Sequence, residues 1–167
     1  MKSCVCSTRL GWIGLSFSKK GLRGATLPQT SAQAASEDLR RRGASEPIDA
    51  AEAGEWAQLL RRYAAGEPVS FSDEVDLEQG TPFQRRVWQT LLEIPRGETR
   101  SYGWVAERIG RPGAARAVGQ AVGANPLAIV VPCHRVVASD GGLGGYGGGR
   151  ELKERLLRIE GARAGSE

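Results

Sequence analysis

A cysteine beside the only histidine of the chain is the pattern with the clearest chemistry. Cys133 and His134 lie in the run Pro132-Cys133-His134-Arg135, and the 167 residues contain no other histidine. Cysteine reacts as its thiolate, and a nearby imidazole, acting directly or through a water, commonly takes up the proton. The apolar residues 127–131 lead into Pro132, which predicts a short buried strand ending in a rigid turn. The pattern therefore predicts transfer of a chemical group to the sulfur of Cys133, held in a cleft.

The composition is that of a soluble globular protein with one domain or two small ones. The net charge of +4 and the pI of about 9.2 permit a polyanionic partner without requiring one. No apolar stretch approaches the roughly 20 residues that span a bilayer, and residues 1–7 make a poor signal peptide. Three cysteines do not form a disulfide framework. We therefore expect a cytoplasmic protein.

Cys4 and Cys6 allow two interpretations. They could be half of a metal site, but a zinc site would then need carboxylate ligands, because the histidine and third cysteine belong to the motif above. The interpretation that we favour is two strand residues that point to one face of a sheet. No metal is expected.

Residues 1–76 predict a first domain that contains a small sheet and a helix. Alternating apolar residues at 13, 15 and 17 predict a strand, and a second strand is expected at 22–27. Residues 28–47 predict a loop or a poorly fixed helix. An apolar stripe from Trp56 to Tyr63 predicts a helix over 50–65, followed by a short strand around Val69, Phe71 and Val75. The stretch 76–80 is expected to be a linker.

Residues 77–161 predict a second, mostly helical domain, with a disordered tail at 162–167. Helices are expected from Thr81-Pro82 to Pro95, at 102–109 behind the cap Ser101, at 114–122 and at 151–160. The two middle helices make a helix-turn-helix pattern, which is common in DNA-binding proteins but also in simple packing units. Small residues on the second of these helices would permit close approach to another surface. Arg116 would project from it, either towards nucleic acid or only into solvent.

The glycine-rich stretch 139–149 is the last unusual feature. It lacks the lysine and hydroxyl residue that a phosphate-binding P-loop needs. Its backbone could approach a flat ligand closely, or it could be a floppy surface loop.

Several motifs together resemble the O6-alkylguanine-DNA alkyltransferases, which are the methylated-DNA–protein-cysteine methyltransferases. They are Arg116-Ala117-Val118-Gly119, Asn125-Pro126, Val131 to Val136 around the cysteine, and Gly145-Tyr146-Gly147-Gly148. The resemblance is dense over 77–161 and looser in the first domain. It implies an α+β fold, with an RNase H-like first domain of antiparallel sheet and helix and a winged-helix-like second domain.

The resemblance also implies a suicide repair reaction that needs no cofactor. A family member binds double-stranded DNA through the minor groove with little sequence preference, as a monomer and in some cases cooperatively. It flips out an O6-alkylguanine, or an O4-alkylthymine, and its cysteine takes the alkyl group permanently.

The residue roles are carried over from the family motifs. The catalytic residues would be Cys133, His134, which takes the thiol proton, Glu160, which orients the imidazole, and Tyr102, which assists the leaving base. Arg116 would fill the gap left by the flipped base, and Asn125 would be the hinge before the cysteine segment. The DNA-binding residues would be Arg116, Ala117, Gly119, Gln120, Tyr102 and Arg135. The substrate pocket would be formed by Asn125, Val136, Tyr146, Gly147 and Gly148.

Two other functions compete with this one. A non-catalytic sensor of alkylated bases would lack the reactive cysteine, which is present here as Cys133. A DNA-binding regulator would have an unreactive, structural cysteine and a marked sequence preference.

The glycine at 147, where some family members have serine, removes one possible hydroxyl contact to the substrate.

Overall fold

The computed structural model describes residues 1–49, 51–71 and 74–162, and it contains two compact units. Unit 1 consists of Met1–Asp76 and Pro126–Val130, and unit 2 of Leu77–Asn125 and Val131–Glu167. Within the described residues, no helix is both long and apolar enough to cross a membrane. The predicted mixture of helices with a small, mainly antiparallel sheet is confirmed.

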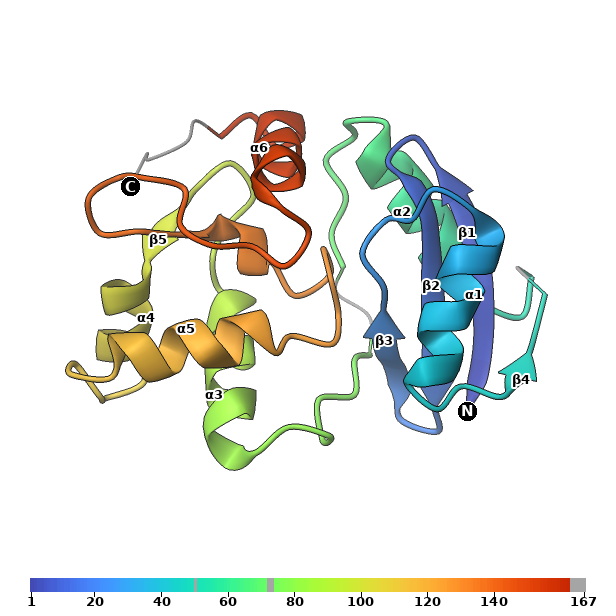
Figure 1. The fold of residues 1–167 in the computed structure, drawn as a ribbon, viewed down its shortest axis with the longest axis horizontal. Coiled ribbons are helices and arrows are strands. Elements are labelled where there is room, and N and C mark those ends of the chain that lie inside the picture. The colour runs from blue at the N-terminus through green and yellow to red at the C-terminus, as the bar shows by residue number, and fades with distance from the viewer. Residues whose placement is uncertain (50, 72–73, 163–167) are drawn as a thin grey trace. The chain divides into compact units, whose positions relative to one another are not determined.

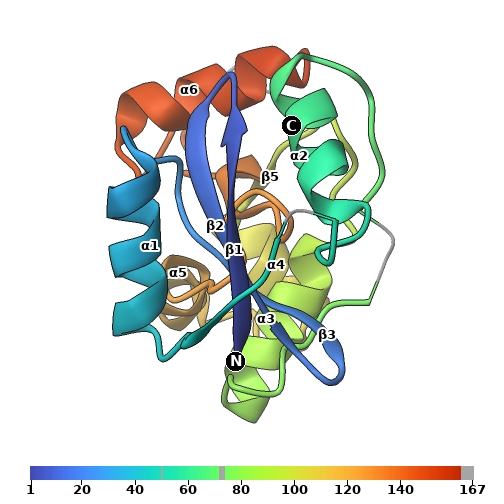
Figure 2. The same ribbon diagram turned by 90° about the vertical axis from the view of Figure 1, so that its right-hand side faces the viewer.

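Unit 1 is a four-stranded sheet with helices α1 and α2 on its opposite faces (Figures 1 and 2). The strand order is β3-β2-β1-β4, antiparallel except for the pairing of β1 with β4. The bounds are β1 Lys2–Thr8, β2 Gly11–Ser18, β3 Gly21–Ala25, α1 Ala32–Arg41, β4 Glu46–Pro47 and α2 Trp56–Ala64.

The helix α1 lies where we expected a loop or a poorly fixed helix. Ser31 caps its first turn, with its hydroxyl accepting a hydrogen bond from Ala34 N at 3.0 Å. Leu39 is buried against Gly14 of β2, where an added Cβ would lie 2.7 Å from the leucine side chain. Tertiary packing of one leucine over a glycine therefore fixes the helix that the polar sequence had left as one of two alternatives.

The segment after α1 also differs from the prediction. Helix α2 begins at Trp56 rather than at residue 50. Residues 69–71 form no strand: Phe71 instead stacks on Trp56, with ring centroids 6.3 Å apart, and lies 5.7 Å from the ring of Tyr63. Val75 makes only an isolated bridge to Leu22. Aromatic packing has taken the place of strand pairing here.

Cys4 and Cys6 are buried on the same face of β1, as predicted. Burial, followed by the charge of Cys6, raises the pKa of Cys4 to about 11, although Arg61 opposes this. Burial also raises the pKa of Cys6. Both residues are therefore thiols at neutral pH and poor nucleophiles.

The linker expected from residue 76 does not begin there, because Asp76 is anchored in unit 1. Its carboxylate accepts a hydrogen bond from the Ser18 hydroxyl at 2.6 Å and forms an ion pair with Arg23 at 3.1 Å. The Asp76 side chain is only 3% exposed.

The apolar run before the cysteine is not the strand that the sequence predicted. Ala25 of β3 donates to Pro126 O at 2.9 Å and accepts from Ala128 N at 3.1 Å. Residues 128–130 then turn, with Ile129 at a φ of 71°. These bonds place 126–130 in unit 1, although the sequence had assigned them to the second domain.

Unit 2 is mostly helical, as expected, and the end of the predicted tail, residues 163–167, lies outside the described residues. Thr81 and Gln84 form a capping box at the start of α3, and Ser101 accepts from Trp104 N at the start of α4. Helices α4 and α5 form the predicted helix-turn-helix. The bounds are α3 Pro82–Leu91, β5 Arg100–Ser101, α4 Tyr102–Arg108, α5 Ala115–Gly123, η1 Cys133–Arg135, β6 Val136–Val137 and α6 Arg150–Ile159.

The contact between Gly14 and Leu39 gives a test of the fold. We expect Gly14→Ala to cost about 2 kcal/mol of stability, because the added methyl group overpacks the core. In a Leu39→Ala background the same change should cost less than about 1 kcal/mol. Urea unfolding measures both, with Gly123→Ala, which meets no atom within 4 Å, as the control. An equal cost in both backgrounds would contradict the packing argument.

Candidate active site

Cys133 opens the one-turn 3-10 helix η1, directly after Pro132. Its amide donates to Val131 O at 2.8 Å. The turn leads into β6, which pairs in parallel with β5 through Arg100–Val136 and Ser101–Val137. Because α4 starts at the next residue, this short ladder fixes the cysteine turn relative to the first turn of α4.

The thiol of Cys133 is nearly enclosed, with the residue 8% exposed. Burial raises its pKa, while the side chains of Asn125 and Tyr146 and the charge of Lys153 favour the thiolate. The Asn125 amide is itself held by a hydrogen bond from Nδ2 to Val131 O at 2.9 Å. The environment therefore keeps the resting group as a thiol but surrounds it with groups that stabilise its ionised form.

The ring of His134 is completely buried and lies against a buried carboxylate. Its Nε2 is 2.7 Å from Glu160 Oε2. Burial lowers the pKa of His134, and Glu160 opposes this effect. Because an ionised carboxylate only accepts hydrogen bonds, Nε2 must carry the hydrogen, and Nδ1 keeps the lone pair in the neutral ring. Nδ1 is thus the basic atom of the ring, in the residue that follows the cysteine.

Arg135 occupies an interior position rather than the DNA-facing surface that the sequence suggested. Its Nε and Nη2 donate to the two oxygens of Glu160 at 2.8 and 3.0 Å, and its Nη1 donates to Ile94 O at 2.7 Å. Only 12% of the side chain is exposed. The guanidinium of Arg135 is therefore occupied by a buried carboxylate, an arrangement that does not favour the expected role of Arg135 in DNA binding.

The ring of His134 and the guanidinium of Arg135 hold Glu160 in its ionised form. Burial raises the pKa of its carboxyl, but the hydrogen bonds and charges of His134 and Arg135 outweigh burial and bring the pKa far below its usual range. Both oxygens of the carboxylate thus accept hydrogen bonds: Oε1 from Arg135, and Oε2 from Arg135 and from the ring of His134.

Lys153 is a site residue that the sequence analysis missed. It is completely buried on α6, and its ammonium donates to the carbonyls of Val136 at 2.6 Å, Leu143, and Gly145 at 3.3 Å. Burial lowers its pKa to about 8, and the charge of Cys133 opposes this. One side chain thus ties the glycine-rich stretch to the strand after the cysteine turn and places a positive charge near the sulfur.

Tyr102, at the start of α4, lies between the second helix of the helix-turn-helix and the glycine-rich stretch. An added Cβ on Gly119 of α5 would be 3.9 Å from its ring, and one on Gly144 would be 3.3 Å from its hydroxyl oxygen. Gly144 has a φ of +73°, so a side chain there would be strained as well as crowded. Burial, and then Cys133, raise the pKa of Tyr102, which remains a hydrogen-bond donor.

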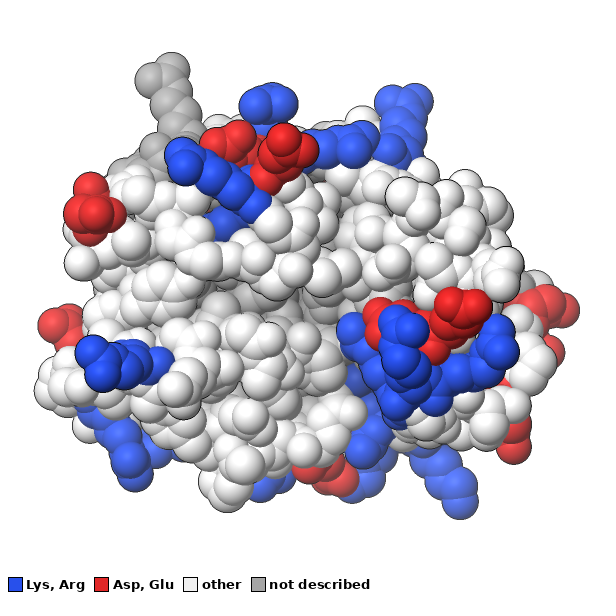
Figure 3. All heavy atoms as spheres, viewed as in Figure 1, with Lys and Arg blue, Asp and Glu red and all other residues white. Residues whose placement is uncertain are grey.

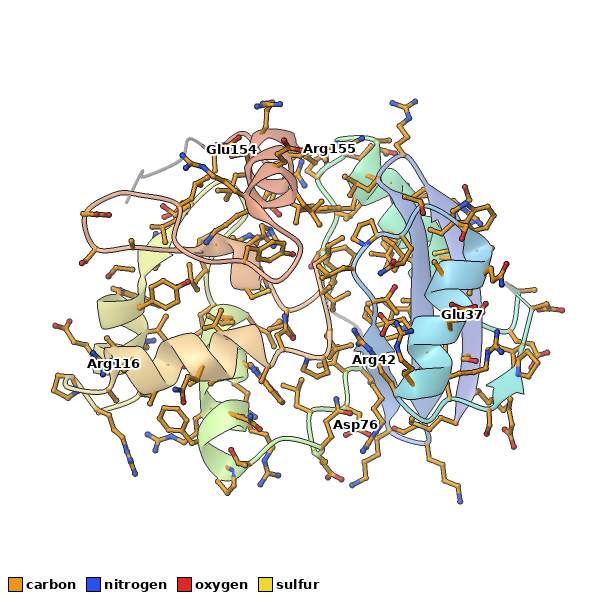
Figure 4. All side chains as sticks on the ribbon, in the orientation of Figure 1. Glu37, Arg42, Asp76, Arg116, Glu154 and Arg155 are labelled. Carbon is orange, nitrogen blue, oxygen red and sulfur yellow. The ribbon has the colours of Figure 1, made fainter. Side chains whose placement is uncertain are left out.

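Helix α5 presents the side chains that the sequence assigned to DNA. Arg116, Ala117 and Gln120 are exposed, Gly119 is half-buried, and the helix buries Val118, Ala121 and Val122. Arg116 extends from the first turn of α5 (Figure 4). Figure 3 shows that the surface around it in this view carries few charged side chains. The exposed face of α5 is thus thin and largely uncharged, with one arginine near its beginning.

The remaining predicted pocket residues differ in how deeply they are buried. The Tyr146 hydroxyl is buried and interacts with Cys133, and burial raises its pKa. Val136 is buried, and its carbonyl already accepts from Lys153. Gly147 is exposed and Gly148 half-buried, both in a turn. Among the described residues, no group of three His, Cys, Asp or Glu side chains could hold a metal ion.

The arrangement suits acid–base activation of the thiol for nucleophilic attack. The neutral imidazole can accept the thiol proton at Nδ1, and Glu160 stabilises the imidazolium that then forms.

The carboxylate should also govern stability in a pH-dependent way. We expect Glu160→Gln to cost about 3 kcal/mol at pH 7, because it leaves the buried Arg135 without its anion. The folded carboxyl has a depressed pKa, so its contribution is complete above the unfolded value of about 4.3 and is lost as the pH falls further. Urea unfolding at pH 7, 5 and 3 should therefore show the difference from wild type shrinking below pH 4.

Glu154→Gln is the matched control on the same helix. Glu154 is 40% exposed and pairs only with Arg150, at 3.4 Å, so its loss should change stability by less than about 1 kcal/mol. A constant deficit for Glu160→Gln from pH 7 to pH 3 would contradict the depressed pKa.

Comparison with known proteins places this site in a family. Residues 82–162 match the model of the 6-O-methylguanine DNA methyltransferase, DNA binding domain. Proteins named methylated-DNA–protein-cysteine methyltransferase are 60% identical over 105 residues in Mycobacterium tuberculosis and 50% identical over 121 residues in Shigella flexneri. These alignments cover 63% and 72% of this chain and 63% and 71% of the relatives, so the mycobacterial match spans less than two thirds of that protein's length.

Solved structures extend the likeness to nearly the whole chain. The structure of M. tuberculosis OGT in complex with DNA has a TM-score of 0.83 and 43% identity, covering 96% of this chain and 93% of that one. The O6-methylguanine-DNA methyltransferase of Pyrococcus kodakaraensis has a TM-score of 0.75 and 31% identity, with 96% and 99% coverage. Because the Shigella flexneri relative is 50% identical over 72% of this chain, and the M. tuberculosis structure is 43% identical over 96% of it, the chain belongs to the O6-methylguanine-DNA methyltransferase family, the methylated-DNA–protein-cysteine methyltransferases.

Proposed function

We propose that the protein repairs DNA by moving the alkyl group of O6-alkylguanine, and of O4-alkylthymine, onto Cys133 in a single-turnover reaction. The observation that carries this proposal is a hydrogen bond between the ring of His134 and the buried, ionised Glu160. His134 is the only histidine of the chain and directly follows Cys133. Membership of the family and the names of its relatives support the same activity.

The chemistry follows from the atoms of the site. The thiol of Cys133 gives its proton, through a water, to Nδ1 of His134, and the resulting thiolate attacks the alkyl carbon in line with the bond to oxygen. The S–C bond forms as the C–O bond breaks, and the electron pair goes to the base. Tyr102 donates a hydrogen bond or a proton to the base as this charge builds. The balance is complete without a cofactor, and the thioether that remains is permanent.

DNA is the partner in this proposal, because a base in a duplex must leave the stack before the sulfur can reach it. Helix α5 enters the minor groove, where its small exposed residues permit close approach. Arg116 fills the space that the flipped base leaves, and Asn125 is the hinge between α5 and the cysteine segment. The exposed face of α5 offers only Arg116 and Gln120 as side chains that could read base edges, which favours binding with little sequence preference.

One chain is sufficient for the reaction, so we propose a monomer that can bind DNA in several copies. Cys133, His134, Glu160 and Tyr102 all belong to unit 2 of the same chain. The three free cysteines suit a reducing cytoplasm.

The adduct itself is the direct test. Incubation with a duplex that contains O6-methylguanine should add one methyl group to the Cys133 peptide, measured by mass spectrometry. The peptide with Cys4 and Cys6 should remain unmodified, since both thiols have raised pKa values and the only histidine of the chain follows Cys133 instead. Cys133→Ser should give no adduct. A folded wild-type protein that binds this duplex without forming an adduct would be a sensor of lesions instead.

Base flipping can be separated from chemistry at Arg116. We expect Arg116→Ala to slow repair of duplex DNA by at least about tenfold, since base extrusion costs a few kcal/mol. Its reaction with free O6-benzylguanine should be unchanged, because no base has to be flipped. Single-turnover rates on both substrates measure this, with Arg111→Ala, an exposed arginine before α5, as the control. Equal slowing on both substrates would argue against a role in flipping.

A further inference from the structure

Arg135 has a place in the proton relay that the sequence did not indicate. Its guanidinium forms a two-bond fork with Glu160 at 2.8 and 3.0 Å. The oxygen that accepts from Nη2 of Arg135, Oε2, also accepts from His134 Nε2 at 2.7 Å. The arginine and the imidazole therefore share one carboxylate oxygen, and the position of the arginine determines where that oxygen lies.

The position of Glu160 in the fold makes such a cation necessary. Glu160 is the C-terminal cap of α6, where the partial negative charge of the helix end disfavours a carboxylate. It is also 6% exposed, so solvent does little to stabilise its charge. A neutral imidazole provides only one hydrogen bond. The fork of Arg135 supplies the full positive charge that a buried carboxylate needs.

The guanidinium of Arg135 makes a further hydrogen bond to the backbone, which fixes its position relative to Glu160. Its Nη1 donates to Ile94 O at 2.7 Å, in the turn after α3. Arg96, from the same turn, donates through Nη2 to Ile159 O at 2.9 Å, one residue before Glu160. Two arginines thus connect the 94–96 turn to the end of α6, and Arg135 bonds to the carboxylate itself.

We propose that Arg135 is a positioning residue of the transfer reaction: it locks Glu160 against Nε2 of His134 and so reserves the opposite ring nitrogen for the proton of Cys133. This inference rests on the proposed function. Arg135 touches neither sulfur nor substrate in this role and acts through Glu160. The guanidinium of Arg135 is, with Lys153, a positive charge near the ring, and it opposes protonation of His134 before the thiol gives up its proton.

The charged and titratable groups around the ring come from three elements. Glu160 and Lys153 face it from α6, and Cys133 and Arg135 are its neighbours in η1. Tyr146, from the glycine-rich stretch, interacts with Cys133 and Glu160. Glu160 raises the pKa of His134, whereas burial, Arg135 and Lys153 lower it. Removal of the Arg135 charge should therefore raise the pKa of the ring.

The single histidine makes the test direct, because one imidazole signal in the NMR spectrum reports the relay without any substrate. In Arg135→Met the apparent pKa of His134 should rise by about one unit or more relative to wild type. In Arg135→Lys, which keeps the charge, the titration should follow wild type. Arg150→Met, which removes an arginine with a 78% exposed side chain at the start of α6, is the control and should also follow wild type.

Alkyl transfer gives the second readout, as a single-turnover rate on methylated duplex measured from pH 5.5 to 8.5. Arg135→Met should lose the most activity at the acid end, where its His134 is already protonated. Arg135→Lys should be slower by about tenfold at every pH, because a lysine cannot form the fork. A purely structural role would lower the rate of Arg135→Met equally at all pH values.

The possible outcomes separate the inference from the proposed function. Superimposable His134 titrations for wild type and Arg135→Met, or parallel rate profiles, would overturn the role of Arg135 even if alkyl transfer is observed. Failure of the wild type to transfer an alkyl group would overturn the function, whatever the titrations show. If Arg135→Met does not fold, Arg135→Gln takes its place, and Arg135→Lys still tests the fork: a wild-type rate for it would overturn the proposal.

Discussion

A single buried carboxylate determines the chemistry of this site. Glu160 accepts from the ring of His134 and from the fork of Arg135, and it stays ionised although it is enclosed at the end of a helix. An ionised carboxylate cannot donate, so it sets the tautomer of the ring. The tautomer in turn decides which nitrogen can serve the thiol. Without this interaction, Cys133 would be an enclosed thiol with a raised pKa and no base.

The scaffold holds this centre with few elements. A parallel ladder of two residues on each strand connects the cysteine turn to the start of α4 and hence to Tyr102. The ammonium of Lys153 donates to the carbonyl of Val136, before the glycine-rich stretch, and to two carbonyls within that stretch. That stretch is therefore not a floppy surface loop: its glycines permit close approach to the tyrosine ring, and a buried cation anchors it. A buried ammonium is costly, and such groups are commonly retained for function.

The buried face of helix α6 contains two charged side chains among its leucines. Lys153, Leu156, Leu157 and Glu160 follow one another at the helical spacing i, i+3, i+4 and i+7, and all four are buried. Leu152, the other leucine of the helix, is only half-buried. The lysine and the glutamate interrupt an apolar stripe, and such an interruption is the signal that identifies a buried charge. Only Glu160 was recognised beforehand, and through the family resemblance.

Local patterns in the sequence indicated the capped helix starts at Thr81 and Ser101, the strand through residues 13–17, and a cysteine next to the only histidine, because these depend on neighbouring residues. They could not show that α1 is ordered by Leu39 over Gly14, or that Phe71 stacks instead of pairing, since both depend on distant partners. The family motifs placed Arg135 among the DNA-binding residues, whereas its guanidinium pairs with Glu160 inside unit 2. Only the tertiary structure could bring the end of α6 to the cysteine turn, where the charge of Glu160 required a cation within reach.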